Sequence, residues 1–183
     1  MSDEVKKILL HACCGICSGD PIRQLRDLGY KPVVYFYNPN IDTKEEFDRR
    51  LDAQKTVCDF LNTELIVETY CPSEYINVVQ GYENEPEHGK RCILCFKLRL
   101  LKSAYKAKEL GINYFTTSMV ISPHKDFELL SKIGFDIASH IDNLEYVSVN
   151  FKKKDGFLKT NQLAKDLNLY RQNYCGCKFA KRF

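Results

Sequence analysis

The 183-residue sequence contains no apolar run that approaches the roughly 20 residues needed for a membrane-spanning helix. Its polar beginning, Met-Ser-Asp-Glu, differs from a secretory signal peptide. The motifs S-G-G-x-D-S and G-x-x-x-x-G-K-S/T are also missing, which argues against an ATP-dependent enzyme that carries such a loop on an α/β sheet. Because there is no internal repeat, linker or low-complexity tract either, we expect a cytoplasmic protein with one domain over residues 1–183 and no membrane partner.

Cysteine, in contrast, is abundant, with nine residues in the chain. In a reducing compartment, thiols serve metal binding or catalysis more often than a disulfide framework, and the odd number leaves at least one thiol unpaired. Seven of the nine fall into three short clusters: Cys13-Cys14-x-x-Cys17, Cys92-x-x-Cys95 and Cys175-x-Cys177. The other two, Cys58 and Cys71, stand alone, and we expect them to be buried apolar residues.

The alternation of strand-like and helix-like segments predicts an α/β fold. Apolar runs predict strands over 5–10, 32–37, 64–67, 113–117 and 146–151. Helical periodicity predicts helices over 20–28, 43–62, 91–110 and 160–168, and one that ends near 133, whereas the polar segment 72–89 predicts a loop. Strands joined by helices form right-handed crossovers, so we expect a mostly parallel, Rossmann-like (HUP-like) sheet flanked by helices.

Local signals predict where two of these helices begin. Ser18 to Pro21 is typical of an N-cap followed by a first-turn proline, which would leave the first three cysteines in a loop. Thr43 followed by Glu46 is a capping box. In an open α/β sheet, the loop after the first strand lies at the carboxyl edge, where ligands bind. Here thiols occupy positions that glycines usually hold in phosphate-binding loops.

Four thiols are candidates for one metal centre: Cys13 and Cys14 at the end of the first strand, and Cys92 and Cys95 at the start of a helix. The helix N-terminus favours the thiolate form that metals require. Four thiolates suit tetrahedral zinc or an iron–sulfur cluster. Adjacent cysteines fit the usual spacing of a zinc knuckle poorly, so the pattern favours iron–sulfur without excluding zinc.

The remaining clustered thiols are open to more than one interpretation. Cys175 and Cys177, separated by one glycine, could form a small, strained disulfide of the redox-active kind. They could equally be a further pair of metal ligands. Cys17 could ligate a second metal beside the first centre or donate a proton, and the neighbouring His11 could assist or simply be a core residue.

Positive charge is concentrated at the C-terminal end. From residue 150 onward there are nine Lys and Arg against two Asp, a formal charge of +7, which leaves −4 for residues 1–149. The basic residues are Lys152, Lys153, Lys154, Lys159, Lys165, Arg171, Lys178, Lys181 and Arg182. A basic, cysteine-containing tail on an acidic body suits a contact with nucleic acid, although a merely solvated surface would have the same composition.

The chain resembles the QueH-type epoxyqueuosine reductases in five ordered motifs: H-A-C-C-G-I-C-S (11–18), Y-N-P-N-I (37–41), C-I-L-C (92–95), T-T-S-M-V-I-S-P (116–123) and R-Q-N-Y-C-G-C (171–177). The resemblance runs from Lys7 to Phe183. It implies cobalamin-independent reduction of the epoxide of epoxyqueuosine, at the wobble position of tRNA, to an alkene. It also implies a [4Fe–4S] cluster on Cys13, Cys14, Cys92 and Cys95, and a redox-active pair formed by Cys175 and Cys177.

The implied reaction removes one oxygen as water and consumes two electrons and two protons, so an external electron donor must be a partner besides the tRNA. A [4Fe–4S] cluster passes single electrons, which makes a second redox group useful, such as a mononuclear iron held by Cys17. Residues at the strand ends are expected to position the modified nucleoside: Tyr37, Asn38, Asn40, Ser118 and Ser122.

Two other functions stay open on the sequence. One is a zinc-stabilised RNA-binding module without catalysis, which predicts a colourless protein with stoichiometric zinc. The other is a thiol–disulfide oxidoreductase that uses Cys175 and Cys177 and needs no iron. A brown colour after purification without oxygen would exclude the simple form of both.

Overall fold

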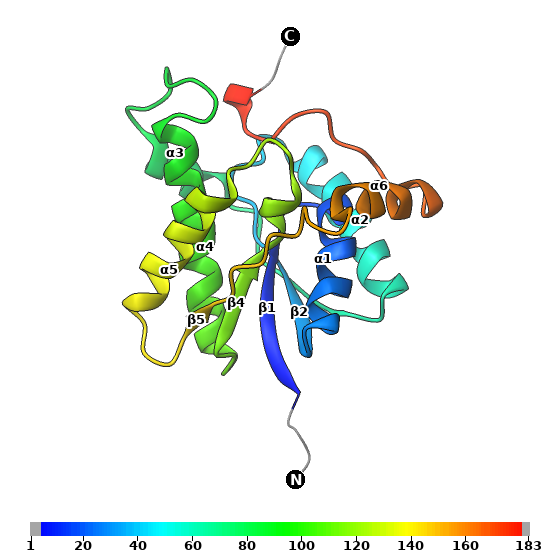
Figure 1. Ribbon diagram of the computed structural model, residues 1–183. Coiled ribbons are helices and arrows are strands. Elements are labelled where there is room, and N and C mark those ends of the chain that lie inside the picture. Colours follow the sequence, from blue (N-terminus) through cyan, green and yellow to red (C-terminus); the bar gives the residue numbers. More distant parts are fainter. Residues whose placement is uncertain (1–4, 181–183) are drawn as a thin grey trace.

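A parallel β-sheet forms the centre of the computed structural model, which describes residues 5–180 (Figure 1). Within these residues the sheet has five strands in the order β3-β2-β1-β4-β5: β1 (Lys6–Ala12), β2 (Tyr30–Phe36), β3 (Glu64–Val67), β4 (Tyr114–Thr117) and β5 (Glu145–Tyr146). Neighbouring strands are parallel throughout. The predicted Rossmann-like α/β fold is therefore confirmed.

Helices cover both faces of the sheet (Figure 1). On one face α1 (Gly15–Asp27) packs against α2 (Lys44–Phe60) and α6 (Gly156–Asp166). On the other face α4 (Lys90–Glu109) packs against α3 (Pro72–Val79) and α5 (Phe127–Ser139). Two short 3₁₀ helices are η1 (Ser118–Ile121), directly after β4, and η2 (Lys178–Ala180). No helix in the described part of the chain is long and apolar enough to cross a membrane.

The two longest strands are apolar on both sides because helices cover both faces of the sheet. Ile8, Leu9 and Leu10 of β1 are fully buried, and Val33 and Val34 of β2 are buried beside them. These side chains belong to one core that continues into the helices on either face. The apolar runs in the sequence predicted both strands correctly.

The chain reverses its direction of travel across the sheet at β1. From β1 it proceeds outward through β2 to β3, and it then returns to place β4 on the other side of β1. At such a switch point the loops after the two central strands diverge and open a crevice at the carboxyl edge. The loop after β1 carries Cys13 and Cys14, and the segment after β4 carries Ser118 to Lys125.

The start of α1 corrects one prediction. The helix begins at Gly15 with Cys14 as its N-cap, so Cys17 is helical and Pro21 lies inside the helix rather than in its first turn. The reason is tertiary packing, since a Cβ at Gly15 would lie 2.4 Å from the Ala53 carbonyl oxygen of α2. Glycine therefore lets the first turn of α1 rest on the backbone of α2. The capping box of α2 is confirmed, with the Thr43 hydroxyl accepting from the Glu46 N–H.

Four further elements differ from the sequence pattern. The polar segment 72–89 contains α3, because Tyr75 and Val79, one turn apart, are buried together. Helix α5 continues past Gly134, on which the ring of Tyr146 packs, and ends at Ser139. Strand β5 has two residues instead of six, since the short β4 pairs with it through Tyr114 and Phe115. Helix α6 begins at Gly156, four residues before its predicted start at 160.

Candidate functional site

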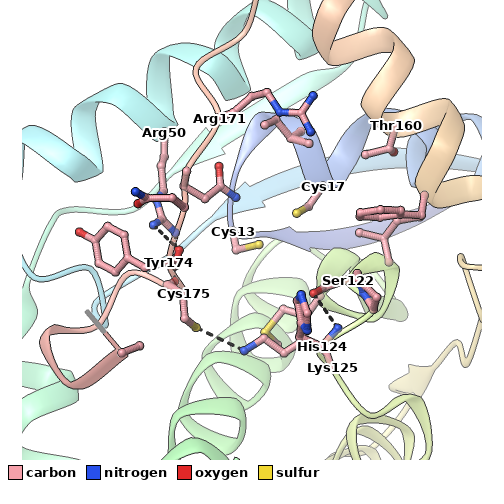
Figure 2. A pocket seen from close by; sticks show the side chains of 18 of the residues that line it. Cys13, Cys17, Arg50, Ser122, His124, Lys125, Thr160, Arg171, Tyr174 and Cys175 are labelled. Atoms are coloured by element: carbon pink, nitrogen blue, oxygen red, sulfur yellow. Dashed lines mark hydrogen bonds between the residues drawn. The ribbon is translucent and has the colours of Figure 1, made fainter. Parts of the chain in front are cut away.

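A cavity of about 430 Å³ opens at the carboxyl edge of the sheet, and three thiols line it: Cys13, Cys17 and Cys175 (Figure 2). Its walls come from the start of α1, the segment after β4, helix α6 and the C-terminal tail. Segments that are far apart in the sequence therefore meet where the topology predicts a ligand site.

The first cysteine cluster is compact. The Sγ atoms of Cys13, Cys14 and Cys17 all lie within 4.8 Å of one another, an arrangement that could hold a metal ion. Cys14 is in an extended conformation at the N-cap, and its Sγ is 3.8 Å from that of Cys13. Hydrogen bonds from the Cys14 and Cys17 thiols hold the pKa of Cys13 well below its ordinary value, so Cys13 is the most readily ionised thiol of the cluster.

The second cluster occupies the first two turns of α4, as predicted. Cys92 is partly exposed, and its sulfur accepts the backbone N–H of His88 at 3.3 Å. Cys95 is buried in a small apolar cluster with Tyr75, Val79 and Cys177. Burial raises the pKa of the Cys95 thiol to about 12. In the described residues these two thiols lie outside the compact group formed by the first cluster.

Two cations, the buried Arg99 and the partly buried Lys125, connect the cysteine clusters. Arg99 interacts electrostatically with Cys13, Cys95 and Cys175, and its Nη2 donates to the Asn38 side chain at 2.7 Å. The Nζ of Lys125 donates to the Cys175 sulfur at 3.3 Å and lies 5.1 Å from the centroid of a phenylalanine ring. Within residues 5–180 neither cation forms an ion pair with a carboxylate.

A buried cation is costly unless an anion compensates it, and here the thiols are the groups in reach. The guanidinium of Arg99 also has a buried Nε without a hydrogen-bond partner in the described structure. Thiolates, or an anionic group ligated by them, would balance both charges. The donor set and its surroundings therefore fit a cysteine-ligated metal centre.

The tail that carries Cys175 and Cys177 is fixed at several points across the carboxyl edge of the sheet. Arg50 of α2 donates to the carbonyl oxygens of Tyr174 and Cys175, each at 3.0 Å, and the dashed lines at Arg50 in Figure 2 mark such bonds. The Gln172 amide donates to the Cys14 sulfur at 2.8 Å, which joins the tail to the first cysteine cluster. Gly176 has a φ of +116°, a conformation that favours glycine, and packs on the Arg50 guanidinium.

The two tail thiols face different surroundings. Cys175 lines the cavity beside Lys125, whereas Cys177 is buried with Cys95 and interacts with the Tyr75 hydroxyl. All nine cysteines are free thiols in this structure. Of the two lone cysteines, Cys58 is buried as expected, and Cys71 is partly exposed next to Ser73.

Of the five residues predicted to position a substrate, Ser122 lines the cavity. The Tyr37 hydroxyl instead donates to Glu74, and the Asn38 amide donates to the Ala12 carbonyl oxygen at 2.9 Å while its oxygen accepts from Arg99. Asn40 and Ser118 are buried, and each has a side-chain oxygen without a partner among the described residues. Substrate contact by these five residues stays a prediction. Asn38 also positions Arg99, because its side-chain oxygen accepts a hydrogen bond from the guanidinium.

The buried imidazole of His11 hydrogen-bonds to residues at the ends of both neighbouring strands. Its Nε2 lies 3.0 Å from the carbonyl oxygen of Tyr37, which can only accept, so this nitrogen carries the proton. Its Nδ1 then accepts from the Thr117 hydroxyl at 3.0 Å. Burial, together with the charge of Arg99, lowers the pKa of His11 to about 3 and keeps the imidazole neutral. Both ring nitrogens are used in joining β1 to the ends of β2 and β4.

Sequence reasoning missed Arg50, Arg99 and Lys125. Arg99 could have been found, because it follows Cys95 by four residues on a helix and so shares its face. Arg50 and Lys125 carry no such signal, since the residue that each contacts in the tail, Cys175, lies 125 and 50 residues away along the chain. The cavity-lining residues of α6, Phe157 and Asn161, were likewise not predicted.

The fold and the site together define a Rossmann-like α/β protein with a cysteine-lined cavity at the switch point of its sheet. The model of the family Epoxyqueuosine reductase QueH matches residues 8–182. The chain therefore belongs to the epoxyqueuosine reductase QueH family.

Named relatives agree with this assignment, and a solved structure shares the fold. The chain is 39% identical to Epoxyqueuosine reductase QueH of Streptococcus pyogenes serotype M1, covering 96% of this chain and 70% of that protein. It is 34% identical to the protein of the same name in Acinetobacter baylyi, covering 100% of this chain and 84% of that protein. The U34-tRNA thiolase NcsA from Methanococcus maripaludis, solved with its [4Fe–4S] cluster, is similar with a TM-score of 0.61 and 14% identity over 98% of this chain and 63% of that one. The last similarity shows a shared fold.

Proposed function

We propose that this chain reduces the epoxide of epoxyqueuosine in tRNA to the alkene of queuosine. One observation carries the proposal: a chain of this family places three thiols and two cations around a single cavity large enough for a nucleoside. The reaction breaks both carbon–oxygen bonds of the epoxide, takes up two electrons and two protons, and releases the oxygen as water. An external electron donor supplies the electrons.

The proposed ligands of a [4Fe–4S] cluster are Cys13, Cys14, Cys92 and Cys95. Such a cluster would supply single electrons to the reaction when bound. The compact first cluster, the second pair on α4 and the positive charge of Arg99 near both support this ligand set. Gln172 would donate its N–H to the sulfur of a ligating Cys14, a contact of the kind that orients metal ligands.

Cys17, Cys175 and Cys177 are proposed to take part in the reaction. Cys17 lines the cavity and would hold a second, mononuclear iron or donate a proton to the substrate. Cys175 and Cys177 would cycle between dithiol and disulfide and relay two electrons. Lys125 supports a role for Cys175, because its ammonium group donates a hydrogen bond to this sulfur at the cavity wall.

The proposed macromolecular substrate is tRNA, which places the reaction in the cytoplasm, and we propose one domain over residues 1–183. Lys153 and Lys154 are exposed in the turn before α6, near the cavity wall that this helix forms. Lys152 is partly buried, and its Nζ donates to the Lys125 carbonyl oxygen. Lys181 and Arg182, also predicted to bind tRNA, lie outside the described residues.

A direct assay tests this function. Protein purified without oxygen is incubated with epoxyqueuosine-containing tRNA and a chemical one-electron reductant, and the nucleosides are then separated and weighed by mass spectrometry. We expect conversion to a product lighter by one oxygen atom. Unchanged epoxyqueuosine with iron-replete protein would contradict the proposal.

A further inference from the structure

One wall of the cavity carries an exposed aromatic ring. Phe157, in the first turn of α6, is 41% exposed and lines the cavity together with Cys13 and Cys17. Phe60 and Phe135 are exposed to a similar extent but lie outside the cavity lining, so Phe157 is the exposed phenylalanine that faces the thiols among the described residues. We propose that Phe157 stacks on the nucleobase that bears the epoxide, within a nucleotide subsite formed by α6 and the tail. The inference rests on the proposed tRNA substrate and assigns the residues that hold its reacting nucleotide.

The backbone before Phe157 is held in a costly conformation. Lys154 and Asp155 have φ values of +56° and +59°, in the left-handed region that residues with a Cβ rarely adopt. At the next position a Cβ on Gly156 would lie 1.8 Å from the carbonyl oxygen of Phe151, so only glycine fits there. Two consecutive strained residues followed by an obligatory glycine fix the place where α6 begins. Phe157 is the first side chain after this turn.

Helix α6 is also anchored firmly on α1. A Cβ at Gly19 of α1 would lie 2.5 Å from Leu163, so the two helices are in close contact. The buried Thr160 hydroxyl accepts the backbone N–H of Asp20 at 3.3 Å. Because Cys17 belongs to the same helix α1, the ring of Phe157 and the Cys17 thiol are held in a fixed relation. A base stacked on Phe157 would thus have its side arm within the cavity that the thiols line.

A polar pair completes the subsite. Arg171 and Asn161 both line the cavity, and Arg171 donates to the Asn161 side-chain oxygen at 2.7 Å. The guanidinium is exposed and has five N–H groups, so donors stay available for a phosphate or a base edge. An aromatic face beside an arginine is the combination that proteins use to hold a base turned out of a single-stranded loop. The wobble position lies in such a loop.

The test measures RNA binding by full-length, iron-containing protein under anaerobic conditions. The probe is an anticodon stem-loop RNA with guanine at the wobble position, compared with the same hairpin made abasic there. Phe157→Ala should weaken binding of the first hairpin by about 5- to 150-fold, the range for one stacked base. Leu158→Ala is the matched control, because Leu158 is the next residue, is 66% exposed and lies outside the cavity lining. Phe157→Tyr should restore binding.

The abasic hairpin decides which base is involved. If Phe157 stacks on the wobble base, the abasic hairpin binds wild type and Phe157→Ala equally well. The salt dependence of binding should be the same in both proteins, because the stacked contact is uncharged. An equal loss on both hairpins, or no loss on either, overturns the inference. These affinities are measured without turnover. If the wild-type protein failed to reduce epoxyqueuosine, the proposed function would be contradicted, but the comparison of the two hairpins would still test whether Phe157 stacks on the wobble base.

Discussion

Arg50, in the middle of α2, donates a hydrogen bond of 3.0 Å to the backbone carbonyl oxygen of Cys175, which lies 125 residues further along the chain. The same guanidinium binds the Tyr174 carbonyl, and its Nε pairs with the buried carboxylate of Glu46 at 2.7 Å. The helix thus fixes the peptide groups on both sides of Cys175. The position of the Cys175 thiol at the cavity depends on this contact.

Arg50→Lys is therefore expected to loosen the tail. Lysine keeps the positive charge that pairs with Glu46, but its ammonium group cannot make the two forked hydrogen bonds to the carbonyl oxygens of Tyr174 and Cys175. Alkylation of Cys175 under native conditions, followed by peptide mass spectrometry, should be at least about tenfold faster, since hydrogen bonds to charged groups contribute about 1.5–3 kcal/mol each. Arg49→Lys, at the exposed neighbouring position, is the control and should label like wild type. Equal rates in all three proteins would show that Arg50 does not hold the tail.

Replacing the proposed cluster ligands should remove iron. Alanine at Cys13, Cys14, Cys92 or Cys95 is expected to lower iron and sulfide content and to weaken the visible charge-transfer absorption, because each substitution deletes one thiolate ligand. Cys71→Ala serves as control, since this lone thiol contacts Ser73 and is expected to keep full iron. If a variant lacking all four cysteines retains its iron, the ligand assignment is wrong.

Cys17→Ala should separate chemistry from cluster binding. Its thiol lines the cavity within the first cysteine group, although it is not among the four proposed cluster ligands. We expect the variant to keep the cluster absorption and to lose turnover of epoxyqueuosine by about 10²-fold or more, as removal of an acid or a metal ligand commonly does. Wild-type activity in this protein would exclude Cys17 from the reaction.

The tail thiols can be assigned by two measurements on the same proteins. If Cys175 and Cys177 form a redox pair, serine at either position should leave the iron content intact and abolish multiple turnover. The oxidised wild-type enzyme should then show two fewer free thiols after reaction with substrate. An unchanged thiol count, together with the loss of one metal equivalent in either variant, would instead make them ligands of a second metal.

The basic turn before α6 should contribute to tRNA affinity and not to chemistry. Lys153→Ala/Lys154→Ala removes two exposed charges without touching the Lys152 contact to Lys125. We expect the salt slope of tRNA binding to fall by about two units, one per lost phosphate contact, with the single-turnover rate unchanged. Lys31→Ala is the control, because Lys31 is exposed near the amino end of β2, away from the carboxyl edge. A double variant with wild-type affinity and salt slope would exclude this turn as a tRNA contact.

The sequence alone determined the sheet, the longer helices and the cysteine clusters. Local rules were sufficient where burial and periodicity agree: the runs Ile8–Leu10 and Val33–Val34 form the central strands, and Thr43 caps α2 through Glu46. The placement of Cys92 at a helix start also followed from the pattern. The five family motifs then identified the family, because they span nearly the whole chain in order.

Tertiary structure decided what surrounds the thiols. Helix α1 begins at Gly15 because that residue rests on the α2 backbone, and α6 begins at Gly156 because the Phe151 carbonyl leaves no room for a Cβ. Neither contact has a local signature, since each joins residues from separate segments. Buried cations such as Arg99 are likewise stabilised by groups distant in sequence, which become neighbours only when the parallel strands bring their carboxyl ends to one edge.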